Sequence, residues 1–313
     1  MRKFIIIAGP TAVGKSRVAV ELAKKLNTEV VSADSIQIYK GLDIGSAKIT
    51  PEEMQGIKHH MLSIVEPTDS YSVKEYQKAA FKIIDELNMQ HKIPIICGGT
   101  GFYINSLIYE LNLDEDSKSD EIRSKLCDLY EKEGIEPIRA ELEKCDPVSF
   151  DRIHQNDAKR NIRALEYFKC KGLPFSESLK SSRKLNLNSN FKYYALIRDR
   201  EVLYRNIEKR IDLMIEDGLI DEVKTLYNRG LNEHDQSMQG IGYKEIFKYL
   251  KDEWEYDYAI SKLKQFSRNY AKRQITWYRN DENAELIDAD KFKNNDSIVD
   301  YIIGEIKDDG FLQ

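Results

Sequence analysis

The chain has 313 residues, 41 % of them hydrophobic and 32 % charged, which is enough apolar content to bury a substantial core without disulfide or metal staples. Its four cysteines, Cys97, Cys127, Cys145 and Cys170, are scattered and form no C-x-x-C pair. This pattern argues against a zinc site and a disulfide framework and fits a cytoplasmic setting. The formal net charge of −5 argues weakly against a nucleic-acid partner, but the position of the basic clusters matters more than the sum.

The first apolar run, 4–8, is too short for the core of a signal peptide and leads directly into a glycine loop. No run approaches the roughly 18 apolar residues of a membrane span, so we expect no membrane association. Five short apolar runs are predicted as strands: 4–8, 29–32, 93–97, 193–197 and 284–288. Amphipathic helices are predicted between them, because apolar residues recur at helical spacing after the first strand and ahead of the third. This alternation indicates an α/β fold with a mainly parallel sheet, whose ligand should lie beyond the carboxyl ends of the strands.

Residues 113–186 break the alternation, since they contain many charges and helical periodicity but no good strand. We interpret them as a helical insertion. Helices are expected again over 199–229 and 240–279, so the α/β core is predicted to comprise residues 1–112 and 187–313. The last thirty residues are polar, and beyond the strand expected at 284–288 little is assigned to them.

The most specific motif follows the first strand and matches G-x-x-x-x-G-K-[ST], the pattern of a phosphate-binding loop between a strand and a helix. It consists of Gly9, Pro10, Thr11, Ala12, Val13, Gly14, Lys15 and Ser16. Such a loop turns backbone N–H groups around a diphosphate at a helix N-terminus. Lys15 would contact the phosphates, and the Ser16 hydroxyl would bind Mg²⁺. The motif specifies an anion but does not say whether a phosphoryl group is transferred or the whole diphosphate leaves.

Asp34 is predicted at the carboxyl end of the second strand, where its side chain would face the same crevice. A kinase would use such a carboxylate as a Mg²⁺ ligand or as a base for a hydroxyl. A transferase acting on an amine would use it to hydrogen-bond that amine. The alternative is a turn or a helix cap, where aspartate is favoured for purely local reasons.

Arg210 lies within an otherwise apolar stripe, because Leu203, Ile207, Arg210 and Met214 follow one another at helical spacing. A guanidinium in that position needs a partner. A bidentate contact with a diphosphate would satisfy it, and so would a buried ion pair with an acidic side chain.

Basic residues gather in two tracts. Residues 151–171 hold six basic residues against three acidic ones, and residues 268–279 hold four basic residues and no acidic one, with Tyr270, Trp277 and Tyr278 between them. Such tracts suit phosphate contacts and base stacking, although a solvated helix face has the same composition. His59 and His60 are adjacent, so at most one could reach a site, and we interpret both as structural.

Seven stretches of the chain resemble, in order, those of the bacterial tRNA dimethylallyltransferases. They are GPTAVGKS, SADSIQIYKGLDIGSAK, GGTGFYINSL, CDPVSFDRIHQNDAKRNIRALE, LYRNIEKRIDLMIEDGLIDEV, QGIGYKE and KRQITWYR. Two departures occur, since many members have His-Pro-Asn-Asp at 154–157 and Gly-Thr-Ala-Lys at 45–48. Neither departure removes a charged group. The resemblance implies a P-loop NTPase-like core with a helical insertion that grips the tRNA anticodon stem-loop.

The resemblance also implies an activity, the transfer of a dimethylallyl group from dimethylallyl diphosphate to the exocyclic amine of the adenosine 3′-adjacent to the anticodon. Thr11 would lie near the bridging oxygen of the leaving group, Asp34 would hold the amine and act as general base, and Arg210 would neutralise the departing diphosphate. The implied tRNA contacts are Asp34, Ser35, Ile36, Gln37, Thr100, Arg123, Lys159, Arg160, Asn161, Ile162 and Arg163. Mg²⁺ is the expected cofactor and a monomer the expected state.

Three rivals share parts of this pattern. An adenylate isopentenyltransferase would use the same loop and aspartate on a free nucleotide, without needing a basic insertion. A small-molecule kinase would release ADP. A nucleotide switch would bind GTP or ATP, but the chain has no guanine-reading N-K-x-D motif.

Overall fold

The chain divides into two compact units in its computed structural model, which describes residues 1–111, 119–181 and 184–312. One unit comprises Met1–Leu107 with Leu187–Gln313, and the other comprises Ile108–Asn186. The start of the expected insertion, residue 113, lies outside the described residues.

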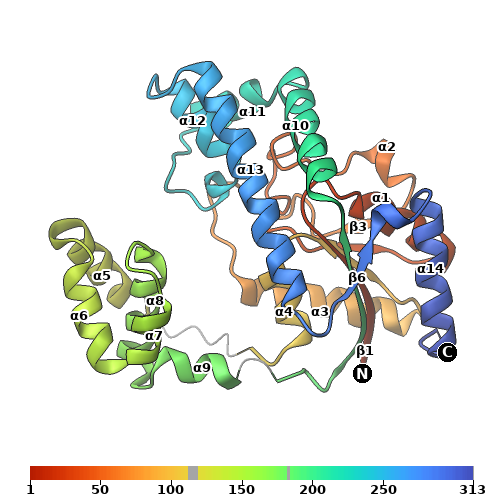
Figure 1. Cartoon of the computed structure of the whole chain (residues 1–313), viewed down its shortest axis with the longest axis horizontal. Coiled ribbons are helices and arrows are strands. Elements are labelled where there is room, and N and C mark those ends of the chain that lie inside the picture. The colour runs from red at the N-terminus through yellow and green to blue at the C-terminus, as the bar shows by residue number, and fades with distance from the viewer. Residues whose placement is uncertain (112–118, 182–183, 313) are drawn as a thin grey trace. The chain divides into compact units, whose positions relative to one another are not determined.

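A six-stranded, all-parallel sheet forms the centre of the first unit (Figure 1). Its strands lie in the order β3-β2-β4-β1-β5-β6. They are β1 (Arg2–Ala8), β2 (Val30–Ser32), β3 (His59–His60), β4 (Ile95–Gly98), β5 (Ser189–Ile197) and β6 (Glu285–Asp288). The α/β fold and the parallel sheet predicted from the sequence are therefore confirmed. The short edge strand β3 was not predicted, because its two histidines form no apolar run.

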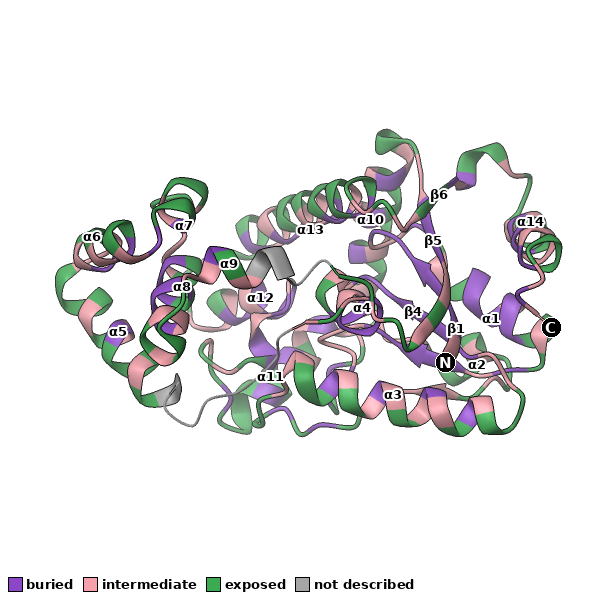
Figure 2. Cartoon of the chain, turned by 90° about the horizontal axis from the view of Figure 1, so that it is seen from below, coloured by how far each residue is buried: buried purple, intermediate pink, exposed green. Residues whose placement is uncertain are grey.

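Helices cover the sheet and extend beyond one end of it. They are α1 (Lys15–Leu26), α2 (Pro51–Met54), α3 (Val73–Met89), α4 (Gly101–Ile108), α10 (Arg200–Glu216), α11 (Leu219–Asn228), α12 (Tyr243–Leu250), α13 (Tyr256–Arg279) and α14 (Asn295–Asp308). The central strands β2 and β4 and most of β1 are buried, the edge strands β3 and β6 are only partly buried, and the covering helices expose their outer sides (Figure 2). This is the burial pattern expected of a parallel sheet.

The sequence analysis missed α14, which lies in the polar last thirty residues. Asn294 caps its first turn by accepting from the Ser297 N–H at 3.0 Å. Ile298, Ile302 and Ile306 recur at four-residue spacing and are fully buried in the core. Low average hydropathy therefore concealed a narrow apolar stripe, which is enough to bury one face of a helix.

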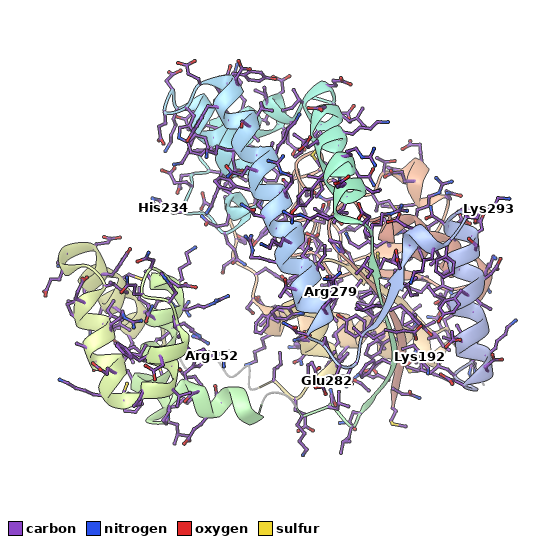
Figure 3. All side chains as sticks on the ribbon, viewed as in Figure 1. Arg152, Lys192, His234, Arg279, Glu282 and Lys293 are labelled. Atoms are coloured by element: carbon purple, nitrogen blue, oxygen red, sulfur yellow. The ribbon has the colours of Figure 1, made fainter. Side chains whose placement is uncertain are left out.

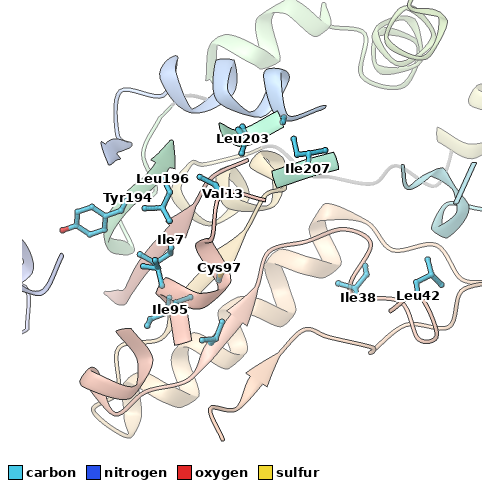
Figure 4. Close-up of a cluster of buried hydrophobic side chains, with 14 of the residues drawn as sticks. Ile7, Val13, Ile38, Leu42, Ile95, Cys97, Tyr194, Leu196, Leu203 and Ile207 are labelled. Atoms are coloured by element: carbon cyan, nitrogen blue, oxygen red, sulfur yellow. The ribbon is translucent and has the colours of Figure 1, made fainter. Parts of the chain in front are cut away.

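The core beneath the phosphate-binding loop brings together side chains from both ends of the chain (Figure 4). Ile7 of β1 and Leu196 of β5 pack with Val13 of the loop, and Leu203 and Ile207 of α10 belong to the same cluster. The loop is thus fixed to the sheet and to the helix that carries Arg210.

The second unit is built from helices: α5 (Ser119–Glu133), α6 (Glu136–Cys145), α7 (Pro147–Arg152), α8 (Ala158–Lys171) and α9 (Phe175–Ser181). Its core includes Leu126 of α5, Leu142 of α6 and Leu165 of α8. Figure 3 labels Arg152, which ends α7. Among the helices described in either unit, none combines the length and apolar content needed to span a bilayer.

Candidate active site

The loop after β1 has the backbone of an anion nest. Gly9, Ala12 and Gly14 have φ angles of 151°, 61° and 102°, which turn successive peptide groups inward. A Cβ at Gly9 would lie 2.8 Å from the Leu196 carbonyl oxygen, so only glycine fits there. No side chain caps α1 at Gly14, and its first N–H groups are therefore open to an anion.

Lys15 and Ser16 begin α1 at this nest. The Lys15 ammonium lies 3.5 Å from the Pro10 carbonyl oxygen, and burial lowers its pKa. A diphosphate bound at this point would stabilise the charged form of the amine, because its negative charge replaces the hydration that burial removes. Ser16 is exposed and lines the same cavity as Lys15. Beside them Cys97, the next-to-last residue of β4, is a buried thiol whose pKa burial raises to about 11, so it stays protonated and neutral.

Asp34 follows β2, and its two carboxylate oxygens have different surroundings. Oδ1 accepts the N–H groups of Ile36 at 2.9 Å and Gln37 at 3.2 Å, which closes a local turn. Among the described residues no hydrogen bond reaches Oδ2, and Asp34 lines the cavity. The expected turn role and the expected site role are thus combined, with one oxygen for each.

Thr100, Ser35 and Gln37 hold the wall around Asp34. The Thr100 hydroxyl accepts the Ser35 N–H at 3.1 Å, and the Gln37 amide donates to the carbonyl oxygens of Ser46 and Ala47, both at 3.1 Å. These polar groups therefore have internal partners. Of the implied nucleotide contacts, Ser35, Ile36 and Gln37 do line the cavity, while Thr100 supports them.

Arg210 projects from α10 to the phosphate loop. Its guanidinium donates to the Thr11 hydroxyl at 3.3 Å and to the Ala47 carbonyl oxygen at 3.4 Å, both long contacts. Burial lowers the Arg210 pKa, and the nearby carboxylates of Asp34 and Glu53 oppose that shift. Within the described part of the chain no acidic group lies within ion-pair distance of Arg210, so the ion-pair alternative for this residue is not observed.

Gln274 of α13 is a site residue that the sequence analysis did not single out. Its side-chain oxygen accepts the Thr11 N–H at 3.0 Å, and its amide donates to the Gly99 carbonyl oxygen at 2.9 Å. One buried amide thus ties the phosphate loop to the loop after β4. The only sequence signal is a glutamine on the inward face of an amphipathic helix.

Glu222 of α11 was also missed. Its carboxylate accepts the N–H groups of Asp43, Ile44 and Gly45 at 2.7–3.0 Å and the Tyr243 hydroxyl at 2.8 Å. This bond set fixes the segment that supplies Ser46 and Ala47 to the cavity wall. No local pattern in the sequence pairs Glu222 with a loop so distant along the chain.

Many of the groups described above line one cavity of about 450 Å³, and Cys97, Thr100 and Glu222 lie outside its lining. Its polar part includes Thr11, Lys15, Ser16, Asp34 and Arg210. Its apolar part includes Ile207, Ile211, Met214, Leu219, Ile241 and Leu263. The cavity can therefore take a ligand with an anionic head and an apolar tail.

The donor set here suits Mg²⁺ only in combination with a phosphate ligand. The described residues contain no group of three or more His, Cys, Asp or Glu side chains placed to hold a metal. The Ser16 hydroxyl and the Asp34 carboxylate line the cavity. Since Mg²⁺ commonly binds through one or two protein oxygens, substrate phosphates and water, these residues fit it.

In the helical unit, the implied tRNA contacts divide into two groups. Arg123, Lys159, Arg160 and Arg163 are exposed. Asn161 and Ile162 are buried, and the Asn161 amide donates to the carbonyl oxygens of His154 at 3.1 Å and Asp157 at 2.9 Å.

The expectation for Asn161 and Ile162 is therefore corrected. Their side chains belong to the interior of the unit, because consecutive residues of a helix cannot all face the same side.

The tract 268–279 is partly available as a surface, because Lys272, Arg273 and Arg279 are exposed. Arg268 forms an ion pair with Glu208 of α10 at 2.5 Å, and Tyr278 is buried. Trp277 remains 41 % exposed, and Arg279 ends the helix at the surface (Figure 3). Of the tract's three aromatic residues, Trp277 is therefore exposed, Tyr270 is half-buried and lines the cavity, and Tyr278 is buried.

Comparisons with known proteins identify the family of the chain. The family model described as IPP transferase matches residues 37–281. The full-length tRNA isopentenylpyrophosphate transferase of Bacillus halodurans is 40 % identical over 100 % of this chain and 99 % of its own, with a TM-score of 0.72. The tRNA delta(2)-isopentenylpyrophosphate transferase of Staphylococcus epidermidis is 38 % identical over 98 % and 99 %, with a TM-score of 0.70. A eukaryotic dimethylallyltransferase acting on tRNA is 30 % identical over 99 % of this chain and 80 % of its own, with a TM-score of 0.81. With a family model that covers most of its length and relatives that align from end to end, the chain belongs to the IPP transferase family.

Proposed function

We propose that this protein transfers the dimethylallyl group of dimethylallyl diphosphate to the exocyclic amine of the tRNA adenosine 3′-adjacent to the anticodon. The observation that carries the proposal is the cavity itself. It joins an anion nest, an arginine without an acidic partner among the described residues, a carboxylate with one open oxygen and an apolar region. Family membership supplies the reaction class.

The reaction breaks the bond between the allylic carbon and the bridging oxygen of the diphosphate and forms a bond from that carbon to the amine nitrogen. Negative charge then grows on the departing diphosphate. The nest amides, Lys15 and Arg210 are placed around the polar end of the cavity, where they would stabilise that charge. The Thr11 hydroxyl, held by Arg210, would lie at the bridging oxygen.

The nucleophile needs a hydrogen-bond acceptor that also takes its proton. Asp34 offers Oδ2 for this, since Oδ1 is committed to the turn. A fixed carboxylate orients the amine lone pair toward the allylic carbon, and such positioning accounts for much of the rate of a transfer between two bound substrates.

Mg²⁺, held by Ser16 and the diphosphate oxygens, would supply further positive charge to the leaving group. The target base must leave its stack to enter the cavity, at a cost of a few kcal/mol that is lowest in a single-stranded loop. Contacts of the exposed arginines and lysine in the helical unit with tRNA phosphates would offset this cost.

The direct test incubates the protein with labelled dimethylallyl diphosphate, Mg²⁺ and total tRNA, followed by digestion to nucleosides. Label in an isopentenylated adenosine supports the proposal. Label transferred to AMP in preference to tRNA would instead indicate an adenylate isopentenyltransferase, and release of ADP from ATP would indicate a kinase.

A further inference from the structure

Glu166 of α8 holds two arginines of the helical unit with a single carboxylate. Arg123 of α5 donates to both oxygens, from Nε at 3.2 Å and from Nη2 at 3.0 Å. Arg163, one turn earlier on α8, donates to Oε1 at 2.9 Å. The carboxylate is buried, with 1 % of its side chain exposed, whereas the arginines are 49 % and 48 % exposed.

The charges of this group do not cancel. One carboxylate faces two guanidiniums, and each guanidinium has five N–H donors of which Glu166 takes one or two. The remaining donors have room to face solvent, because about half of each side chain is exposed. The group therefore presents a net positive, donor-rich surface on a buried anionic support.

Linking α5 to α8 does not by itself explain the arrangement. A single ion pair would join the two helices, and the apolar contacts of Leu126 with the α8 residues Ile162 and Leu165 already do so. Burying a carboxylate is costly, and a second arginine on the same oxygen adds repulsion between cations. The pairing does, however, fix the conformations of two long side chains before an anion binds. Less side-chain entropy is then lost on binding.

We propose that Glu166 is a positioning residue that presets Arg123 and Arg163 as a rigid pair for backbone phosphates of the tRNA substrate. Arginine suits this role because its planar fork matches two phosphate oxygens. The inference rests on the proposed function, since it names how that function's RNA partner is held.

The test measures tRNA binding by Glu166→Gln in the full chain, because the two explanations predict opposite signs. If Glu166 only screens the arginines, removal of its charge tightens binding to a polyanion. If it positions them, binding weakens, and we expect about tenfold, the order of effect seen when supporting groups of a binding site are removed. The slope of log affinity against log salt should also fall by about one, because fewer phosphates remain paired.

Two further variants separate positioning from structure. Glu166→Asp keeps the charge but shortens the side chain, so it should weaken binding in the same direction. In the background of Arg123→Gln with Arg163→Gln, Glu166→Gln should have no further effect. The matched control is Glu141→Gln, which removes an acidic partner of Lys169 at the surface of the same unit and should leave tRNA affinity within twofold.

Steady-state kinetics adds a readout that a general loss of fold would not give. The KM for tRNA should rise while kcat at saturating tRNA stays within about twofold, since Glu166 supports binding rather than the chemical step. Unchanged or tighter tRNA binding by Glu166→Asp and Glu166→Gln overturns the inference. It is also overturned if Glu166→Gln weakens tRNA binding in the double-arginine background as much as it does in the wild-type protein. If wild-type protein itself fails to bind tRNA, the proposed function fails instead.

Discussion

Arg210→Ala gives the sharpest test of how the leaving group is stabilised. The structure predicts a large loss of rate with little loss of stability. Arg210 makes two hydrogen bonds of 3.3 and 3.4 Å, and no acidic side chain within the described residues pairs with it. Removing it therefore strands no buried charge, and the free energy of unfolding should fall by about 1 kcal/mol or less.

The transition state differs, because negative charge grows on the diphosphate beside this guanidinium. Loss of one such preorganised charge contact raises the barrier by about 3 kcal/mol, which corresponds to about 10²-fold in rate or more. Arg210→Lys should recover part of the loss, since an ammonium keeps the charge but not the planar pair of donors.

The assay is single-turnover transfer of labelled dimethylallyl to saturating tRNA, with thermal unfolding measured in parallel. The control is Arg205→Ala, which removes an exposed arginine from the same helix and should leave the rate within about twofold. Wild-type rates from Arg210→Ala would refute the assignment, and so would an equal loss from Arg205→Ala.

Three further outcomes follow from other parts of the molecule. Asp34→Asn retains the Oδ1 bonds of the turn but not the base, so transfer should slow by at least about 10²-fold while the dissociation constant for tRNA changes only a few-fold; an equal loss of affinity would contradict this role. Transfer should need Mg²⁺ but no ATP, and inorganic diphosphate should compete with dimethylallyl diphosphate, because a diphosphate alone fills the nest; a strict ATP requirement in the transfer assay would disprove it. Asp146, which is buried, accepts four hydrogen bonds from Ser149 and Ser176, so Asp146→Ala should lower the free energy of unfolding by about 2–4 kcal/mol. Burial alone would raise the Asp146 pKa, but those bonds hold it below its usual value, so the ionised carboxylate should add stability above about pH 4 that falls off at lower pH in thermal melts, and Asp146→Asn should not show that pH dependence.

The sequence predicted those features that short-range physics determines. The phosphate loop was recognisable because Gly9 and Gly14 must adopt backbone angles that other residues avoid, between a strand and a helix that each show their own period. Asp34 was recognisable because it follows the carboxyl end of a buried strand. The parallel sheet could likewise be predicted, because strands and amphipathic helices alternate along the sequence.

Features that depend on long-range contacts could not be predicted. Gln274 and Glu222 look like ordinary polar residues of amphipathic helices, and only the folded chain shows them bonded to Thr11 and to the 43–45 loop. The composition of a basic stretch also does not show which of its side chains face solvent. Asn161 and Ile162 stand between basic residues in the sequence, but the helix turns them inward.

Several of the proposed functional groups are held by neighbours to which no chemical role is assigned. Backbone N–H groups hold one oxygen of Asp34, Gln274 holds the main chain of Thr11, and Glu166 holds the arginines of the helical unit. Such support has a physical reason, because a group that is already oriented loses little entropy when its substrate binds. Since the proposed reaction moves an allylic group from a small diphosphate to a base of a large RNA and releases the diphosphate, both substrates must be aligned before either reacts. The supporting residues are therefore as informative about function as the groups they hold.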